Sequence, residues 1–586
     1  MSLLSELEKT KLYAASSIVS EIGEIRVLHL LPGLPHEDIR CRLYKTSLYS
    51  KNRREYEALS YTWGCGESSS MTLNDRAGFG VTTNLAGALR RLRHQHKPRT
   101  LWVDAICVNQ ADIAERNGQV RLMGDIFSSA TGVLVWLGDV RQTNWMLPSE
   151  DCILYETVDG ESRSYRSPEV RPVGSMDISA TEMQRCALHG ALHDTSPSWW
   201  ERTWVVQEFC KAPANLQMCY GTFEESFDDF FSSEGLLWQL VAYNGHDGVC
   251  QSFWSAQYRL NDIRDKVRNG PMTILDFAEN CFQAAATDAR DKAYSLRSMI
   301  SVDEAKWIEP DYHATTMAVF TRATFASIVG SGHLGILRYA WKTAYRDQSL
   351  PTWVVDFGDS SLLPNDDVRN QLRGPKLFEA PEPWTYATSY PAIQHPSLDE
   401  EFGILSLAGK LFDTIQSFEH LETCSLMTDS YITSAQARRV TSMLWKLLNV
   451  NNARESALLT DASKHRSRTF LQYLLDVFQN WYRWSGTALE AHDLLRDYAL
   501  FSATQEDAAF SIFHTETGYL GLVRGMLQPG DVVVLLHGAP LPAILRPSGM
   551  MTTFEFVGFA IVAFLMGEQG GRVMTDTAEE RYFAIT

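Results

Sequence analysis

Apolar runs and amphipathic stretches alternate in the N-terminal part of the chain. Three runs, residues 56–64, 100–108 and 132–138, are largely apolar, and each has the length of a buried strand. Between them, residues 82–95 and 111–130 repeat apolar side chains at helical spacing, which predicts two amphipathic helices. Alternating strands and helices are typical of a parallel sheet, and wholly apolar strands suit a sheet covered on both faces. The pattern therefore predicts an α/β fold with a doubly wound parallel sheet.

Polar and aromatic residues stand where these predicted strands end. Tyr61, Trp63 and Gly64 close the first strand, and Asp104 closes the second. Ligands bind at the carboxyl ends of the strands in doubly wound sheets, so these residues are candidate ligand contacts. The Asp104 carboxylate has two interpretations, because it either accepts hydrogen bonds from loop amides or faces a ligand.

The rest of the chain is less regular. Residues 140–180 are polar and rich in proline, which predicts an insertion or a long loop. The predicted organisation is an N-terminal region at 1–50, the α/β domain at 51–225, a mostly helical middle region at 226–380, and a mixed helical and β-rich region at 381–586. Helices are expected over 430–500, and strands with glycine turns over the last 80 residues.

Charge narrows the range of partners. The net charge is −18, from 53 basic and 71 acidic side chains. This surplus argues against non-specific binding to nucleic acid or to anionic membranes, since phosphates are repelled over most of the surface. Residues 89–99 form the one basic stretch of note, and it is either a local anion-binding patch or a solvated helix end.

Three further features predict a cytoplasmic protein. The longest apolar run, residues 556–567, is shorter than the roughly 20 residues of a membrane-spanning helix, and it predicts buried strands instead. The first residues lack the basic region and apolar core of a secretory signal. The ten cysteines include no C-x-x-C pair and show no disulfide framework, which indicates a reducing compartment.

Two short patterns have mainly structural interpretations. Cys186, His189 and His193 fall at i, i+3 and i+7, but zinc needs about four ligands and no second cluster lies nearby in the sequence. We therefore expect a surface helix face there, and no metal. Asp112 and Glu115 have the spacing of a capping box at the start of a helix.

The stretch from Ser196 to Lys211 is rich in tryptophan and predicts a helix. Residues four apart share a helix face, so Trp200, Trp204 and Glu208 are expected in one row, with Val205 and Phe209 in the row that faces the core. Indole surface around a carboxylate removes water and tends to raise its pKa.

Glu208 then has two interpretations. In one, its carboxylate binds a sugar hydroxyl or balances a developing positive charge. In the other, Glu208 pairs with Arg202 or Lys211 on a half-buried helix.

Three blocks of the sequence resemble the fungal heterokaryon-incompatibility (HET) domain. They are "YEALSYTWG" at 56–64, the block from Leu101 to Gly138, and "WWERTWVVQE" at 199–208. Segments at 286–300, 309–316, 350–357 and 527–547 resemble the region that often follows this domain. The resemblance implies a fold similar to the Toll/interleukin-1-receptor (TIR) fold, whose members either assemble signalling scaffolds or cleave NAD at the nicotinamide–ribose bond.

In TIR enzymes a glutamate on a helix after a serine–tryptophan motif is catalytic. By this resemblance Glu208 is the first choice for that residue and Glu201 the second. The resemblance further implies that the candidate substrate-binding residues are Tyr61, Trp63, Gly64, Asp104, Trp200, Arg202 and Trp204. The indoles would stack on the nicotinamide or adenine ring, while Asp104 and Tyr61 would bind the ribose. NAD is the expected substrate, and no cofactor is expected.

Three functions follow as hypotheses. The first is a non-self-recognition and programmed cell-death effector that hydrolyses NAD. The second is a non-catalytic signalling module that self-associates through its HET domain or answers an unknown protein trigger. The third is a HET-like protein redirected to small-molecule, secondary-metabolite chemistry, in which the tryptophan-rich face and the C-terminal strands admit an apolar ligand.

Overall fold

The chain divides into two compact units. The computed structural model describes residues 3–64, 68–138, 199–221, 223–232, 259–281, 284–340, 346–359, 395–421, 510–549, 553–562 and 579–586. The first unit comprises Met1–Met272, Ala284–Met299 and Glu309–His313, and the second comprises Thr273–Gln283, Ile300–Ile308 and Ala314–Thr586. The stretch 140–180, the pattern at Cys186, His189 and His193, and the helices expected over 430–500 lie outside the described residues.

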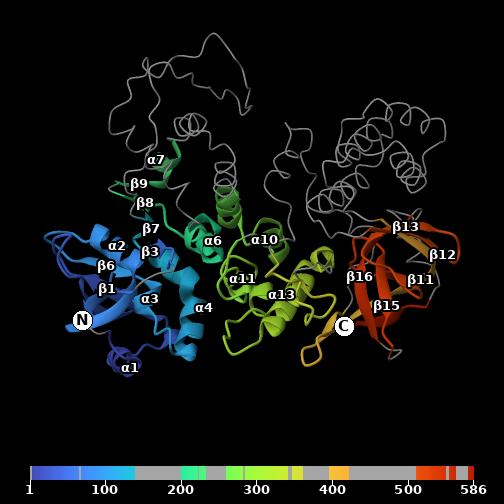
Figure 1. The fold of residues 1–586 in the computed structure, drawn as a ribbon, viewed down its shortest axis with the longest axis horizontal. Coiled ribbons are helices and arrows are strands. Elements are labelled where there is room, and N and C mark those ends of the chain that lie inside the picture. Colours follow the sequence, from blue (N-terminus) through green and yellow to red (C-terminus); the bar gives the residue numbers. More distant parts are fainter. Residues whose placement is uncertain are drawn as a thin grey trace, which may run out of the picture. The chain divides into compact units, whose positions relative to one another are not determined.

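A nine-stranded sheet organises the first unit, and its strands run from blue to green in Figure 1. Its order is β5-β4-β2-β1-β6-β3-β7-β8-β9. The strands are β1 (Glu24–Leu30), β2 (Arg40–Ser47), β3 (Glu57–Tyr61), β4 (Ser68–Leu73), β5 (Arg76–Thr82), β6 (Arg99–Trp102), β7 (Gly132–Gly138), β8 (Leu216–Tyr220) and β9 (Phe223–Ser226).

The predicted parallel sheet is confirmed at the centre and wrong at the edges. The neighbouring strands β6, β3, β7 and β8 pair in parallel. Antiparallel pairing joins β1 to β2, β1 to β6, β4 to β5, and β8 to β9. The β4–β5 hairpin turns at Asn74 and Asp75, which both have positive φ. Asparagine and aspartate tolerate this conformation, which type I′ hairpin turns require. The sheet is therefore mixed.

Helices precede each of the later parallel strands. The helical segments of the first unit are α1 (Glu6–Ala14), η1 (Ser20–Ile22), α2 (Thr83–Leu92), α3 (Asp104–Cys107), α4 (Ile113–Ser129), η3 (Trp199–Glu201), α6 (Thr203–Cys210), α7 (Phe227–Ser232) and α11 (Asp291–Tyr294). The predicted helices at 82–95 and 111–130 are thus confirmed as α2 and α4. The apolar run 100–108 is only half strand, because α3 follows β6 directly. Apolar runs of this length do not distinguish a strand from a short buried helix.

Half of the predicted capping box of α4 is confirmed, because Asp112 caps the helix whereas the Glu115 carboxylate accepts from the N–H of Asn109 and from Arg26. The Asp112 carboxylate accepts a hydrogen bond of 3.1 Å from the backbone N–H of Glu115. Since this bond satisfies one of the free N–H groups of the first turn, we expect Asp112→Ala to cost about 1 kcal/mol of stability. A thermal melt of the variant checks this expectation, and an unchanged midpoint would contradict it.

The second unit joins helices to a β-barrel. Its elements are α10 (Ile274–Cys281), α12 (Val302–Ala305), α13 (Thr316–Ser331), η4 (Gly335–Tyr339), β10 (Ser397–Asp399), β11 (Ile404–Leu421), β12 (Phe510–Thr515), β13 (Leu520–Arg524), β14 (Val532–Leu536), β15 (Ala543–Pro547), β16 (Thr553–Val562) and β17 (Arg581–Ile585).

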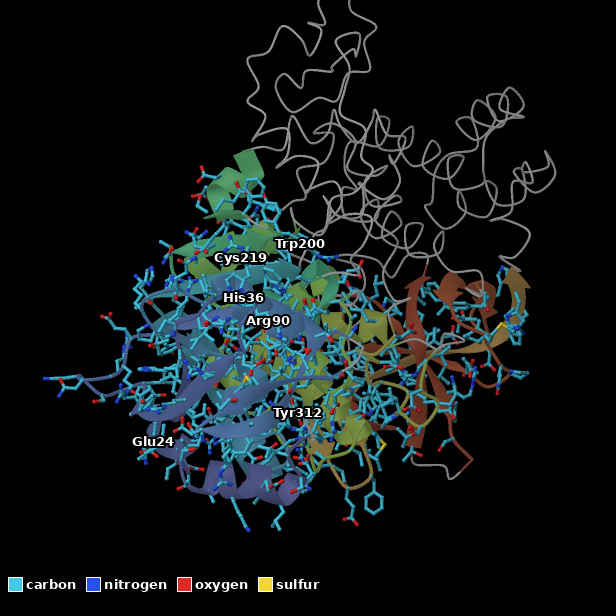
Figure 2. All side chains as sticks on the ribbon, turned by 60° about the vertical axis from the view of Figure 1, so that its left-hand side comes forward. Glu24, His36, Arg90, Trp200, Cys219 and Tyr312 are labelled. Atoms are coloured by element: carbon cyan, nitrogen blue, oxygen red, sulfur yellow. The ribbon has the colours of Figure 1, made fainter. Side chains whose placement is uncertain are left out.

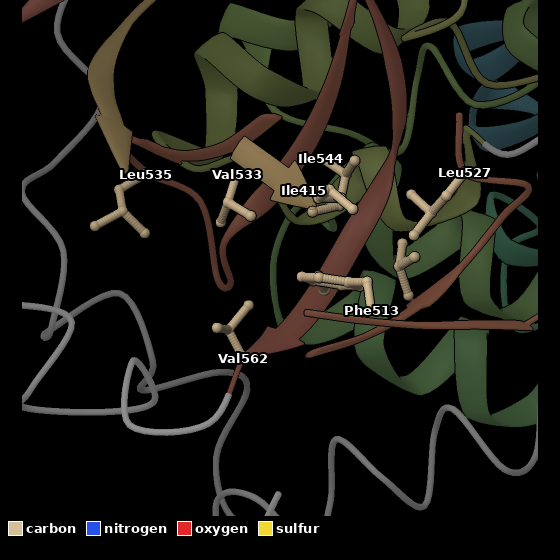
Figure 3. Close-up of a cluster of buried hydrophobic side chains, with 9 residues drawn as sticks. Ile415, Phe513, Leu527, Val533, Leu535, Ile544 and Val562 are labelled. Atoms are coloured by element: carbon tan, nitrogen blue, oxygen red, sulfur yellow. The ribbon is translucent and has the colours of Figure 1, made fainter. Parts of the chain in front are cut away.

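Six of these strands close on themselves. The pairing runs β11-β12-β13-β16-β15-β14, and β14 returns to β11. The interior is filled by apolar side chains, among them Phe513, Val533 and Ile544, which are all fully buried (Figure 3). The strands predicted near the C-terminus are confirmed, since β16 covers much of the apolar run that begins at Phe556. In the described part of the chain no helix is long and apolar enough to cross a membrane.

Candidate functional site

Asp104 lies at the carboxyl edge of the parallel strands, beside the end of β3. One of its carboxylate oxygens accepts a hydrogen bond of 2.8 Å from the Trp63 indole, and the other accepts one of 2.7 Å from the backbone N–H of Ala105. The Tyr61 hydroxyl also hydrogen-bonds Asp104. The carboxylate is half-buried, and burial raises its pKa although nearby Arg202 opposes the shift. Asp104 thus accepts a loop amide, as one interpretation expected, and also contacts two aromatic candidates.

Gly64 and Asn84 determine the conformation of the chain directly after β3. Gly64 has a φ of +74°, a conformation that glycine adopts without strain. The Asn84 amide donates to the carbonyl of Thr62 at 2.6 Å and accepts from the Trp136 indole at 2.9 Å. Asn84, at the start of α2, therefore fixes the segment that carries Trp63. Trp63 itself is 39% exposed.

The expected row of Trp200, Trp204 and Glu208 on one helix is wrong. Helix α6 begins only at Thr203, and Trp200 lies in the preceding 3₁₀ turn. Trp200, which is labelled in Figure 2, is buried and packs against Phe230, with ring centroids 6.3 Å apart. Trp204 keeps its place one turn before Glu208. Because two helical types meet at Arg202, local spacing alone misplaces Trp200.

The core-facing row of the same helix is confirmed. Val205 and Phe209 are fully buried. Their burial fixes the orientation of α6 and so directs Glu208.

Glu208 points inward and is hydrogen-bonded. Its carboxylate accepts a hydrogen bond from the Ser60 hydroxyl, and Ser60 in turn accepts one of 2.6 Å from the Trp199 indole. The residue is only 5% exposed. Burial raises the pKa of Glu208 to about 7, even though Arg202 and the Ser60 bond favour its charged form. Among the residues that the structure describes, Glu208 forms no salt bridge with Arg202 or Lys211.

Arg202 is the positive charge that acts on both carboxylates. Its guanidinium donates to the carbonyl oxygen of Tyr61. Its positive charge opposes the rise in pKa that burial causes in both Asp104 and Glu208. Tyr61 is buried, and desolvation holds the pKa of its hydroxyl well above the usual value. Tyr61, Asp104, Arg202 and Glu208 are thus close enough to influence one another electrostatically, as the sheet pattern predicted for Tyr61 and Asp104.

Trp204 faces a different set of residues. Its side chain interacts with the carboxylate of Asp291, far along the chain. The stacking roles expected of Trp200 and Trp204 stay predictions.

Sequence reasoning overlooked Ser60, Asn84 and Trp199. Ser60 is fully buried in a strand whose other central residues are apolar. A hydroxyl at such a position needs a hydrogen-bond partner, because an unpaired buried polar group is costly. That requirement was the one sequence signal for Ser60.

The basic stretch at 89–99 mainly serves its own fold. Arg91 donates to the carbonyl of Gly221, Arg93 to carbonyls of the segment that ends at Asp38, and Arg99 to Glu57 and Glu224. Neither a solvated helix end nor a free basic patch describes these arginines. Within the described ranges no group of histidine, cysteine and acidic side chains has the arrangement of a metal site.

Comparison with known proteins finds a family match in each unit, and the match in the second unit agrees with the observed β-barrel. The family model "Heterokaryon incompatibility protein (HET)" matches residues 56–208, and "Het-6 beta-barrel domain" matches residues 487–585. The chain is 25% identical to "Heterokaryon incompatibility protein 6, OR allele" of Neurospora crassa, over 98% of this chain and 97% of that protein. No solved structure matches. Residues 56–208 are therefore similar to HET domains and residues 487–585 to Het-6 β-barrel domains, and nearly the whole chain is similar to a fungal heterokaryon-incompatibility protein.

Proposed function

We propose that this protein is an effector of non-self recognition whose HET domain, folded in a TIR-like manner, hydrolyses the nicotinamide–ribose bond of NAD. One observation carries the proposal. Two carboxylates, Asp104 and Glu208, lie beside the end of β3 at the carboxyl edge of the parallel strands, and the charge of Arg202 acts on both. This is the edge at which doubly wound folds bind ligands. The HET resemblance supplies the reaction class.

The reaction needs few protein groups. The bond between ribose C1′ and the nicotinamide nitrogen breaks, and its electron pair leaves with neutral nicotinamide. Positive charge then develops on the ribose, and a fixed carboxylate stabilises it. Water adds to C1′ and loses a proton, so the products are nicotinamide, ADP-ribose and a proton.

Glu208 is the proposed carboxylate, and Arg202 keeps a share of it ionised at neutral pH. The half-buried Asp104 would accept ribose hydroxyls, and the exposed Trp63 offers its indole face to a base. The cytoplasmic NAD pool is the proposed source of substrate. Among the described residues, Cys41, Cys107 and Cys219 are buried and form no disulfide bond, which supports a reducing compartment.

The pH profile of nicotinamide release tests the proposal. Because the reactive form is the carboxylate and the pKa of Glu208 is about 7, we expect release to rise about tenfold per pH unit from pH 5 to pH 7 and to level off above pH 7. The full chain should be incubated with NAD at high protein concentration, and nicotinamide measured by chromatography. Absence of release at every pH, in assembled as well as monomeric protein, would overturn the proposal.

A second function has its own support. Glu208 is already hydrogen-bonded to Ser60 and nearly inaccessible, as expected of a structural acid in a signalling module that self-associates. Expression in a fungal host separates the two functions. If Glu208→Gln abolishes toxicity while light scattering shows unchanged assembly, a purely scaffolding function is excluded. If toxicity follows assembly and ignores Glu208, the signalling function stands.

A further inference from the structure

Two short segments complete the first unit from far along the chain. Residues 284–299 and 309–313, which we call the strap, belong to the first unit, although the residues before, between and after them belong to the second. The HET family match ends at Glu208, so the strap lies outside it. The sequence block "ATDARDKAYSLRSMI", which the proposed reaction leaves unexplained, makes up most of the strap.

The strap holds the beginning of α6 through its backbone. The N–H of Ala285 donates to the carbonyl of Glu201, and the N–H of Thr203 donates to the carbonyl of Ala285 at 2.9 Å. The hydroxyl groups of Thr203 and Ser295 lie 3.2 Å apart. The start of the helix that carries Glu208 is therefore fixed by the strap.

A second contact lies one turn further along α6. The Gln207 amide donates to the Ser298 hydroxyl at 2.7 Å. Ser298 reaches this place because α4 has a glycine, Gly124, where a Cβ atom would collide with the Ser298 side chain. Three elements thus meet closely beside Glu208.

Asp291 provides the anchor. Its carboxylate accepts a hydrogen bond of 2.5 Å from the Tyr312 hydroxyl and also interacts with the Trp204 side chain. Tyr312, labelled in Figure 2, is held in turn by α4: its N–H donates to Asn117 at 3.0 Å, and the Arg116 guanidinium lies 3.7 Å from its ring centroid. Asp291 therefore links Trp204 of α6 to α4.

We infer that the strap positions helix α6 for the reaction, and that Asp291 is a positioning residue for Glu208, acting through Trp204. This inference rests on the proposed function. Trp204 and Glu208 lie one helical turn apart on the same short helix, so a shift of one moves the other. Small displacements of a reacting group are costly, and about 1 Å can lower a rate about 100-fold.

Hydrogen exchange tests the positioning independently of NAD cleavage. In the full chain, we expect Asp291→Asn to speed exchange in peptides covering 203–210 about tenfold, because a hydrogen bond to a charged group is lost. Trp204→Phe should give a similar change. The double variant should be no worse than either single variant, as expected of two partners in one interaction. Asp288→Asn is the matched control, since Asp288 pairs with Arg290 inside the strap.

Kinetics supply the second measurement. Asp291→Asn should lower kcat for nicotinamide release at least tenfold with KM nearly unchanged, while Asp288→Asn should leave both unchanged. Unaltered exchange in 203–210 for both Asp291→Asn and Trp204→Phe would overturn the inference, whatever the kinetics. If the wild type releases no nicotinamide, the proposed function fails, and the exchange experiment still decides whether the strap positions α6.

Discussion

Replacing Glu208 with glutamine is expected to lower nicotinamide release by about 100- to 1000-fold, with KM little changed. This is the usual effect of removing one group that stabilises charge in the transition state. Glutamine keeps the shape of the side chain and an oxygen that accepts the Ser60 hydrogen bond, but it cannot carry the negative charge. Steady-state kinetics at pH 8 measure the effect, because wild-type Glu208 is mostly ionised there.

Glu201→Gln is the control for this experiment. Glu201 is exposed in the 3₁₀ turn before α6 and was the second choice from the sequence. We expect Glu201→Gln to release nicotinamide at the wild-type rate. Loss of activity in Glu201→Gln together with full activity in Glu208→Gln would reverse the assignment.

The pH dependence of protein stability reports on the Glu208 carboxylate, and its measurement needs no substrate. The pKa of Glu208 is raised from 4.5 to about 7 in the folded protein. Between these values the unfolded chain ionises while the folded chain stays protonated, so stability falls as pH rises, by about 3 kcal/mol in all. Glu208→Gln removes this loss and should therefore melt higher than wild type at pH 8, but not at pH 4.5. Glu304 in the second unit has a similarly raised pKa, and its contribution is common to both proteins.

Local patterns in the sequence were sufficient for the centre of the fold. The apolar runs gave β3, β6 and β7, the helical spacing gave α2 and α4, and Asp112 marked a helix start. These features depend on neighbours in the sequence, where periodicity is informative. Parallel pairing then brought Tyr61 and Asp104 together, because parallel strands end at one edge.

The remainder depends on contacts between distant residues. The Ser60–Glu208 bond joins two elements that no periodicity relates, and Trp199 joins them only because the chain turns before α6. Asp291 contacts Trp204 from the strap, beyond the end of the HET match. A boundary drawn after Glu208 separates the helix from the residues that hold it. Any fragment used in place of the full chain should retain residues up to His313.

Arg26→Met is expected to destabilise the first unit by about 3–5 kcal/mol, the usual cost of removing one partner from a buried ion pair. Arg26 is fully buried, and its guanidinium donates to Glu115 at 2.6 and 2.9 Å, to the carbonyl of Cys107 at 3.1 Å and to that of Ser16 at 2.8 Å. The Glu115 side chain is 11% exposed in this pair, so removal of Arg26 leaves a largely buried charge without its partner. Thermal unfolding of the full chain measures the loss of stability. Hydrogen exchange of the β1 amides then shows whether the loss lies in the first unit.

The Arg42 and Asp75 pair is the matched control, because its side chains are 48% and 78% exposed and the charged groups lie 3.3 Å apart. Arg42→Met should cost less than about 1 kcal/mol, since water screens an exposed pair. Adding Glu115→Gln to Arg26→Met should recover part of the loss, because no charge is then left buried. If Arg26→Met cost no more than Arg42→Met, burial would not set the strength of this pair. If the double variant recovered nothing, the loss would lie in the carbonyl contacts to Ser16 and Cys107, which tie the N-terminal segment and α3 to the sheet.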